Sequence, residues 1–253
     1  MSMTGSEDRK MPQQTSSSRV EKRRQATLLE IRSTARQLLR KHGPTGVTVN
    51  AVAREMGMSG PAVYRYYASH DALVEAVIAD FYQELTTTMQ AARDACPPEH
   101  PGRRLAATCR SMRAWAINHP GEFRWMFASP VRAAARHDAE SPRLRAGQQF
   151  EKVFLDQFVD IWEKNPSPAT RFEDLPPSLQ EQILEYAARA DSPLPPEALH
   201  QFLKSWIRLY GLLCMEVLHQ LDFAYSDLEP VFEESLRELC VLHNLEYLPP
   251  QES

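Results

Sequence analysis

The sequence lacks the features that mark membrane and secreted proteins. Its most apolar stretch, residues 206–221, is interrupted by Arg208 and Glu216 and is too short to cross a bilayer. The first 18 residues are polar and contain no apolar segment of the kind that a secretory signal carries. We therefore expect a cytoplasmic protein with no membrane-spanning helix.

Cysteine clusters and catalytic motifs are also absent from the sequence. The four cysteines form no Cys-x-x-Cys pair, so buried free thiols in a reducing compartment are favoured over disulfides or zinc. No glycine-rich phosphate loop, His-Glu-x-x-His or Gly-x-Ser-x-Gly motif occurs. We expect no catalytic site, no metal and no cofactor. An enzyme whose nucleophile and base converge from distant positions stays open as an alternative.

Apolar residues instead recur at helical spacing, and no stretch shows the alternation of a strand. Residues 1–18 have too little apolar surface to fold and are predicted to be a disordered tail. The main helices are expected at about 20–42, 69–95, 197–221 and 227–243, with several shorter ones between. The sequence thus predicts an all-α protein.

The most informative stretch is residues 48–67, which has the pattern of two short helices around a glycine turn. An apolar stripe from Val49 to Met56 fits the first helix. Gly57 follows, where the backbone can turn through a left-handed conformation at little steric cost. Ser59 then offers an N-cap for the second helix. This is the skeleton of a helix-turn-helix, whose second helix can enter the major groove of DNA.

Positive charge is concentrated around this motif. Between Arg19 and Tyr67 the sequence has ten Lys or Arg and three Asp or Glu, a net charge of +7. The whole chain carries −4, so the remainder carries −11. A basic segment on an acidic protein is typical of a protein that meets phosphate with one part only. A solvated helical hairpin with a charged face is the alternative.

Three runs, residues 46–53, 57–67 and 69–73, resemble the DNA-binding domain of the tetracycline-repressor (TetR) family of regulators. The resemblance covers about residues 24–80. It implies a three-helix DNA-binding domain at 19–80, followed by a larger helical effector-binding and dimerisation domain at 81–248. Residues 114–120, 123–127 and 206–211 are similar to a common type of TetR C-terminal domain that has a Trp-x-x-x-His-Gly motif, in which Tyr210 here replaces the His.

The resemblance also implies which residues face DNA. Arg65 suits guanine recognition through its planar guanidinium, and tyrosine hydroxyls suit phosphate contacts. His70 stands where the family usually has Lys, which makes any phosphate contact there weaker or pH-dependent. Val63 and Tyr67 are assigned to the core of the small domain. The expected DNA-binding residues are Thr48, Asn50, Ser59, Gly60, Pro61, Ala62, Tyr64, Arg65, Tyr66 and His70.

The second domain is rich in aromatic residues. They either fill its core or, as the family resemblance implies, line a cavity for a small apolar or aromatic effector between the helices. The residues expected to bind this ligand are Trp115, Phe123, Met126, Phe127, Phe154, Phe158, Trp162, Trp206 and Tyr210.

The last two expected helices are more apolar than one buried face requires. Packing against the same helices of a second chain would cover the excess, and the family dimerises in this way. The apolar residues in question are Leu199, Phe202, Leu203, Trp206, Leu209, Leu212, Leu213, Val217, Leu218 and Leu221.

Taken together, these features predict a homodimeric TetR-like transcription factor. We expect a ligand-responsive repressor that binds a palindromic operator in double-stranded DNA. The alternatives are a helical enzyme, or a protein-interaction module that does not bind DNA.

Overall fold

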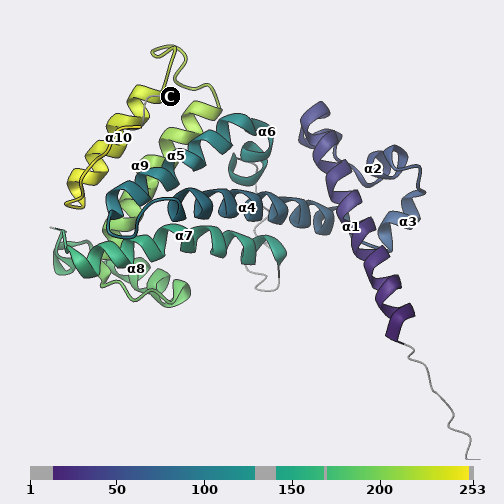
Figure 1. Cartoon of the computed structure of the whole chain (residues 1–253), viewed down its shortest axis with the longest axis horizontal. Coiled ribbons are helices and arrows are strands. Elements are labelled where there is room, and N and C mark those ends of the chain that lie inside the picture. Colours follow the sequence, from purple (N-terminus) through teal and green to yellow (C-terminus); the bar gives the residue numbers. More distant parts are fainter. Residues whose placement is uncertain (1–13, 129–140, 168–169, 251–253) are drawn as a thin grey trace, which may run out of the picture. The chain divides into compact units, whose positions relative to one another are not determined.

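Helices are the regular secondary structure of the residues that the computed structural model describes, which are 14–128, 141–167 and 170–250 (Figure 1). Within these ranges no strand is present, and no helix is both long and apolar enough to cross a membrane. The chain divides into two compact units, Met1–Leu73 and Val74–Ser253, which we describe separately. Most of the predicted N-terminal tail, residues 1–13, lies outside the described residues.

The first unit consists of α1 (Gln14–His42), α2 (Val49–Glu55), α3 (Gly60–Tyr64) and the start of α4 (His70–Asp94). Helix α1 begins before the expected residue 20, so residues 14–18 are helical and the prediction of a tail there was wrong. Extending a nucleated helix costs little, and the polar residues of this segment tolerate helical conformation. The core includes Ile31, Val52 and Val63, which have no exposed surface.

The turn between α2 and α3 has the geometry predicted from Gly57. This glycine has φ of +66°, a conformation that a residue with a Cβ adopts only with strain. The amide of Gly57 donates to the Arg54 carbonyl at 3.2 Å, and the amide of Met58 donates to the Ala53 carbonyl at 2.8 Å. These two bonds form a Schellman motif, which satisfies the last carbonyls of α2 and turns the chain into α3.

The second unit contains the remainder of α4 and all the later helices. Each helix from α5 to α10 has Pro in its first turn, where the missing amide hydrogen leaves no bond unmade. These helices are α5 (Pro101–Asn118), α6 (Pro120–Phe123), α7 (Pro142–Lys164), α8 (Pro177–Ala190), α9 (Pro196–Val217) and α10 (Glu229–Leu242), and a short π-helical segment (Arg124–Ala128) follows α6.

Helix α9 ends at Val217, four residues before the expected end. His219 follows in a left-handed conformation, with φ of 56°, and the amide of Gln220 donates to the Met215 carbonyl at 2.8 Å. Asp191 after α8 and Asn244 after α10 also have positive φ. The sequence pattern missed this boundary because a His stands where glycine usually ends a helix.

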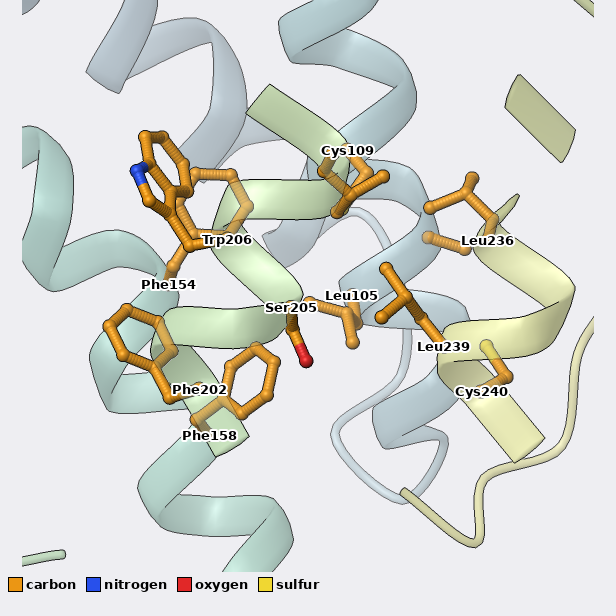
Figure 2. Close-up of a pocket in the computed structure, with 12 residues that line it drawn as sticks. Leu105, Cys109, Phe154, Phe158, Phe202, Ser205, Trp206, Leu236, Leu239 and Cys240 are labelled. Atoms are coloured by element: carbon orange, nitrogen blue, oxygen red, sulfur yellow. The ribbon is translucent and has the colours of Figure 1, made fainter. Parts of the chain in front are cut away.

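The core of the second unit is tightly packed where α5, α7, α9 and α10 meet. Figure 2 shows apolar side chains from these four helices converging, with the Ser205 hydroxyl among them. The space that they leave is about 10 Å³, about enough for one water molecule. This seam is a packed core and not a site for an organic ligand.

One buried hydrogen-bond chain crosses this core. The Ser205 hydroxyl donates to the Gln201 carbonyl at 2.9 Å, and His243 Nε2 lies 2.9 Å from the same hydroxyl oxygen. Because the single hydroxyl hydrogen is already used, His243 Nε2 is the donor of the second bond. Burial lowers the pKa of His243 from 6.5 to about 4.

We predict that His243 makes the protein less stable in mild acid. The folded state favours neutral His243, so its contribution is complete above pH 6.5 and is lost as the pH falls towards 4. Between pH 7 and pH 5 the loss amounts to about 2 kcal/mol of unfolding free energy. Urea unfolding at both pH values should show that His243→Gln reduces this pH dependence, whereas His100→Gln at an exposed position leaves it unchanged. An equal pH dependence in wild type and His243→Gln would contradict the assignment.

Candidate functional site

Helix α3 presents an exposed polar surface in the first unit. Tyr64 is 51% exposed although it is a large aromatic residue, and Arg65 beside it is also exposed. Val63 and Tyr67 point the other way and are buried, as predicted. Of the residues expected to meet DNA, Gly60, Ala62 and Tyr66 are half-buried, and the exposed ones are Thr48, Asn50, Ser59, Pro61, Tyr64, Arg65 and His70.

The N-terminal ends of α2 and α3 lie close together in this surface. The Thr48 hydroxyl caps α2 by accepting the Ala51 amide at 3.1 Å, and its own hydrogen remains able to donate to a phosphate. A Cβ on Gly60 would come within 3.0 Å of the Asn50 side-chain oxygen. Glycine at 60 therefore allows Asn50 to lie against the start of α3.

Ser59 differs from the expectation for an N-cap. Its backbone has the extended conformation of an N-cap residue, but its side chain makes no capping hydrogen bond. The Ser59 carbonyl instead accepts the Ala62 amide at 2.9 Å. The prediction that this hydroxyl caps α3 was therefore wrong, whereas Ser69 does cap α4 by accepting the Ala72 amide at 3.0 Å.

Two tyrosines and His70 connect this surface to the rest of the unit. The Arg24 guanidinium of α1 lies over the Tyr66 ring, 5.6 Å from its centroid, which places a cation beside the half-buried tyrosine. Arg32 donates to the Tyr67 hydroxyl at 3.1 Å. His70 Nε2 lies 2.7 Å from the Val47 carbonyl oxygen, so this ring nitrogen is bound to backbone. Sequence reasoning counted Arg24 only as part of the basic segment.

The second unit contains an aromatic cavity of about 300 Å³. Trp206 and Tyr210 of α9 stack with centroids 5.4 Å apart, and Phe127 and Phe150 approach them edge-on. The ten lining residues come from α4, α7, α8, α9 and the π-helical segment, and are Tyr82, Phe127, Phe150, Glu151, Phe154, Tyr186, Phe202, Leu203, Trp206 and Tyr210.

The structure brings together four of the residues expected to bind a ligand, namely Phe127, Phe154, Trp206 and Tyr210. The others lie elsewhere. Trp115 is buried and donates from its indole nitrogen to Glu84 Oε1 at 2.9 Å. Phe123 and Met126 are buried in the core. Phe158 packs against the Phe202 and His243 rings, and half-buried Trp162 is not among the lining residues.

Sequence reasoning missed the polar part of the cavity. The Tyr186 hydroxyl donates to Glu151 Oε1, which joins α8 to α7. Burial raises the pKa of Tyr186, and the hydrogen bond to Glu151 adds to this effect. Burial also raises the pKa values of Tyr82 and Tyr210. The three phenols are therefore neutral hydrogen-bonding groups at pH 7, and Glu151 is the acidic residue of the described lining.

Family comparisons match both units. Residues 31–77 match the family described as "Bacterial regulatory proteins, tetR family". Residues 105–239, more than half of the chain, match the family described as "Tetracyclin repressor-like, C-terminal domain". The chain belongs to the TetR family. Its members are regulatory proteins and not a class of enzymes.

Individual relatives agree with this assignment. The HTH-type transcriptional regulator Rv1816 of Mycobacterium tuberculosis is 38% identical over 96 residues, which cover 38% of this TetR-family chain and 41% of the relative. The crystal structure of putative regulatory protein SCO4313 has a TM-score of 0.66 and 27% identity, and covers 87% of this chain and 97% of that one. A protein of unknown function from Rhodococcus sp. RHA1 shares the fold, with a TM-score of 0.57, 19% identity and coverage of 84% and 94%.

We predict that the Thr48 cap stabilises the first unit of this TetR-family protein. Thr48→Val removes the acceptor of the Ala51 amide and should cost about 1 kcal/mol, whereas Thr48→Ser keeps the hydroxyl and should cost much less. Hydrogen exchange of the α2 amides measures the effect directly. Equal exchange rates in the two variants would show that the cap does not stabilise the helix.

Proposed function

We propose that this TetR-family protein is a transcriptional regulator that binds a palindromic operator in double-stranded DNA as a homodimer, and that it acts as a repressor. The observation that carries the proposal is the exposed surface of α3, where Tyr64 and Arg65 project from a small basic domain. Direct reading of bases by Arg65 would supply specificity. Thr48, Tyr64 and Tyr66 would bind phosphates and fix the register.

The experiment is a gel shift against the DNA that flanks the protein's own gene, at a fixed salt concentration. Arg65→Ala should weaken binding to the specific site by about 1–3 kcal/mol and leave binding to a random duplex nearly unchanged. Arg171→Ala, which removes an exposed arginine of the second unit, is the matched control. An equal loss on both duplexes would assign Arg65 to phosphate binding, and no loss on either would remove it from the interface. A protein-interaction module would show no duplex binding in any variant.

Dimerisation is proposed through the outer faces of α9 and α10. Ile207 is 65% exposed and Val241 is 71% exposed, and a second chain packed on these faces would bury both side chains. The exposed pair Arg208–Glu238 joins the same two helices. Two recognition helices held about 34–36 Å apart could then enter successive major grooves.

The structure changes which residues can serve in that interface. Leu199, Phe202, Leu209, Leu213 and Val217 are buried within a single protomer, so they do not need a second chain to cover them. Leu203 and Trp206 line the aromatic cavity. The apolar excess on which the sequence argument depended is therefore smaller than expected, and Ile207, which that argument omitted, is the more exposed position.

We predict that Ile207→Glu or Val241→Glu gives monomers. Each change places a charge in the proposed apolar interface but leaves it solvated in a free protomer, so folding should survive while dimerisation is lost. Ile117→Glu at an exposed position on α5 is the control. Sedimentation should show a dimer for wild type and control, and a monomer with weakened operator binding for the two variants. Dimers in all three variants would contradict this interface.

The aromatic cavity is proposed as the effector site, with the protein acting in the cytoplasm and not as an enzyme. A ligand that favours a dimer with a different spacing of recognition helices would lower DNA affinity by its differential affinity for the two states. The cluster of Trp206 and Tyr210 supports this location, as does the resemblance of residues 206–211 to the Trp-x-x-x-His-Gly type of C-terminal domain. Operator release by a compound that also changes tryptophan fluorescence would test the mechanism.

A further inference from the structure

We infer that the aromatic cavity selects a cationic guest, an aromatic or apolar molecule with one ammonium-type group held beside Glu151. This inference rests on the proposed function, because it names the chemical class of the effector for the same site. It depends on the aromatic residues that line the cavity, on the hydrogen-bond partner of Glu151, and on the charge of the neighbouring groove.

The wall of the cavity is made of ring faces and edges. Eight of its ten lining residues are aromatic and one, Leu203, is aliphatic. Phe154 and Trp206 lie side by side, with centroids 5.3 Å apart (Figure 2), and Trp206 stacks on Tyr210. Such walls bind apolar groups by burial, and they bind cations through the negative potential of the ring faces. They offer an anion no comparable attraction.

Glu151 is the one charged residue that the described part of the chain contributes to this wall. Among the described residues its carboxylate has one hydrogen-bond partner, the Tyr186 hydroxyl. A carboxylate can accept about four hydrogen bonds, so Glu151 retains acceptor capacity towards a guest. A neutral guest would displace water from the carboxylate without supplying a charge to compensate it, which is unfavourable. An ammonium group would supply both the charge and the hydrogen bonds.

Glu151 and Tyr186 also line a second, more polar groove between α7 and α8, with a volume of about 1020 Å³. The two residues thus stand between the aromatic cavity and this groove. The described residues give this groove four carboxylates and two cations, namely Glu151, Asp156, Asp160, Asp191, Lys152 and Arg189. An excess of negative charge on the approach raises the local concentration of cations.

Two cations of the groove, Lys152 and Arg189, offset part of this negative charge. Lys152 pairs with Asp156 at 2.7 Å, and the Arg189 guanidinium lies over the Tyr186 ring, 5.5 Å from its centroid. Arg143 lies near the Tyr82 hydroxyl, where it partly opposes the effect of burial on the pKa of Tyr82, and it donates to the Met126 carbonyl at 3.1 Å. An anionic guest would pair with Arg143 or Arg189, so preferred binding of an anion is the competing outcome of the test.

The experiment uses three guests of matched shape, (biphenyl-4-yl)methylammonium, biphenyl-4-methanol and biphenyl-4-carboxylate, with the full-length protein and calorimetry. Wild type should bind the ammonium compound at least about tenfold more tightly than the alcohol, which corresponds to about 1.4 kcal/mol. Glu151→Gln keeps an oxygen for the Tyr186 hydroxyl but removes the charge. It should reduce the preference for ammonium about tenfold and change the affinity for the alcohol less than about twofold.

Glu163→Gln, the same change at an exposed position on α7, is the matched control and should behave as wild type. Equal affinity for ammonium and alcohol, tightest binding of the carboxylate, or an unchanged preference in Glu151→Gln would each overturn the inference and leave the cavity as a proposed effector site. Binding of none of the three guests would overturn both. Charge-selective binding that does not change operator affinity would support the inference and overturn only the proposed induction.

Discussion

The burial of apolar stripes on amphipathic helices is the constraint on which the structure depends. In the first unit α1 packs on α2, and α2 packs on α3, with Ile31, Val52 and Val63 fully buried. This packing leaves α3 with one buried face and one free face. The free face carries Tyr64 and Arg65, so the same residues that build a small core also determine which side chains can meet DNA.

In the second unit some of the aromatic side chains pack tightly in the core, and others surround a cavity. The seam between α5, α7, α9 and α10 is filled almost completely, with about 10 Å³ left. Around Trp206 and Tyr210 the rings pack against one another but enclose about 300 Å³. Phe154, Phe202 and Trp206 line both regions. The cavity lies where these rings meet those of Phe127 and Tyr210, which make T-shaped and stacked contacts around it.

Polar groups inside the second unit have contrasting environments. In the core His243 donates to the Ser205 hydroxyl, which donates to the Gln201 carbonyl, and burial keeps His243 neutral. Glu151 lies where an aromatic wall meets an acidic groove, with Tyr186 as its hydrogen-bond donor. The hydrogen bonds of the first arrangement are made within the core, and they stabilise the fold. The second has acceptor capacity left, which is the physical basis for treating it as part of a binding site.

Sequence alone determined the helical class and the glycine turn at Gly57, because these depend on local periodicity and on the φ preferences of single residues. It also placed Val63 and Tyr67 in the core, since they lie on the apolar side of a short helix. It did not separate Phe127 and Trp206, in the cavity, from Trp115 and Phe123, in the core. Nor did it identify Glu151, one of many acidic residues on helices, whose role depends on Tyr186, 35 positions away. Only tertiary packing brings such residues together, because helical periodicity says which face is apolar but not what that face meets.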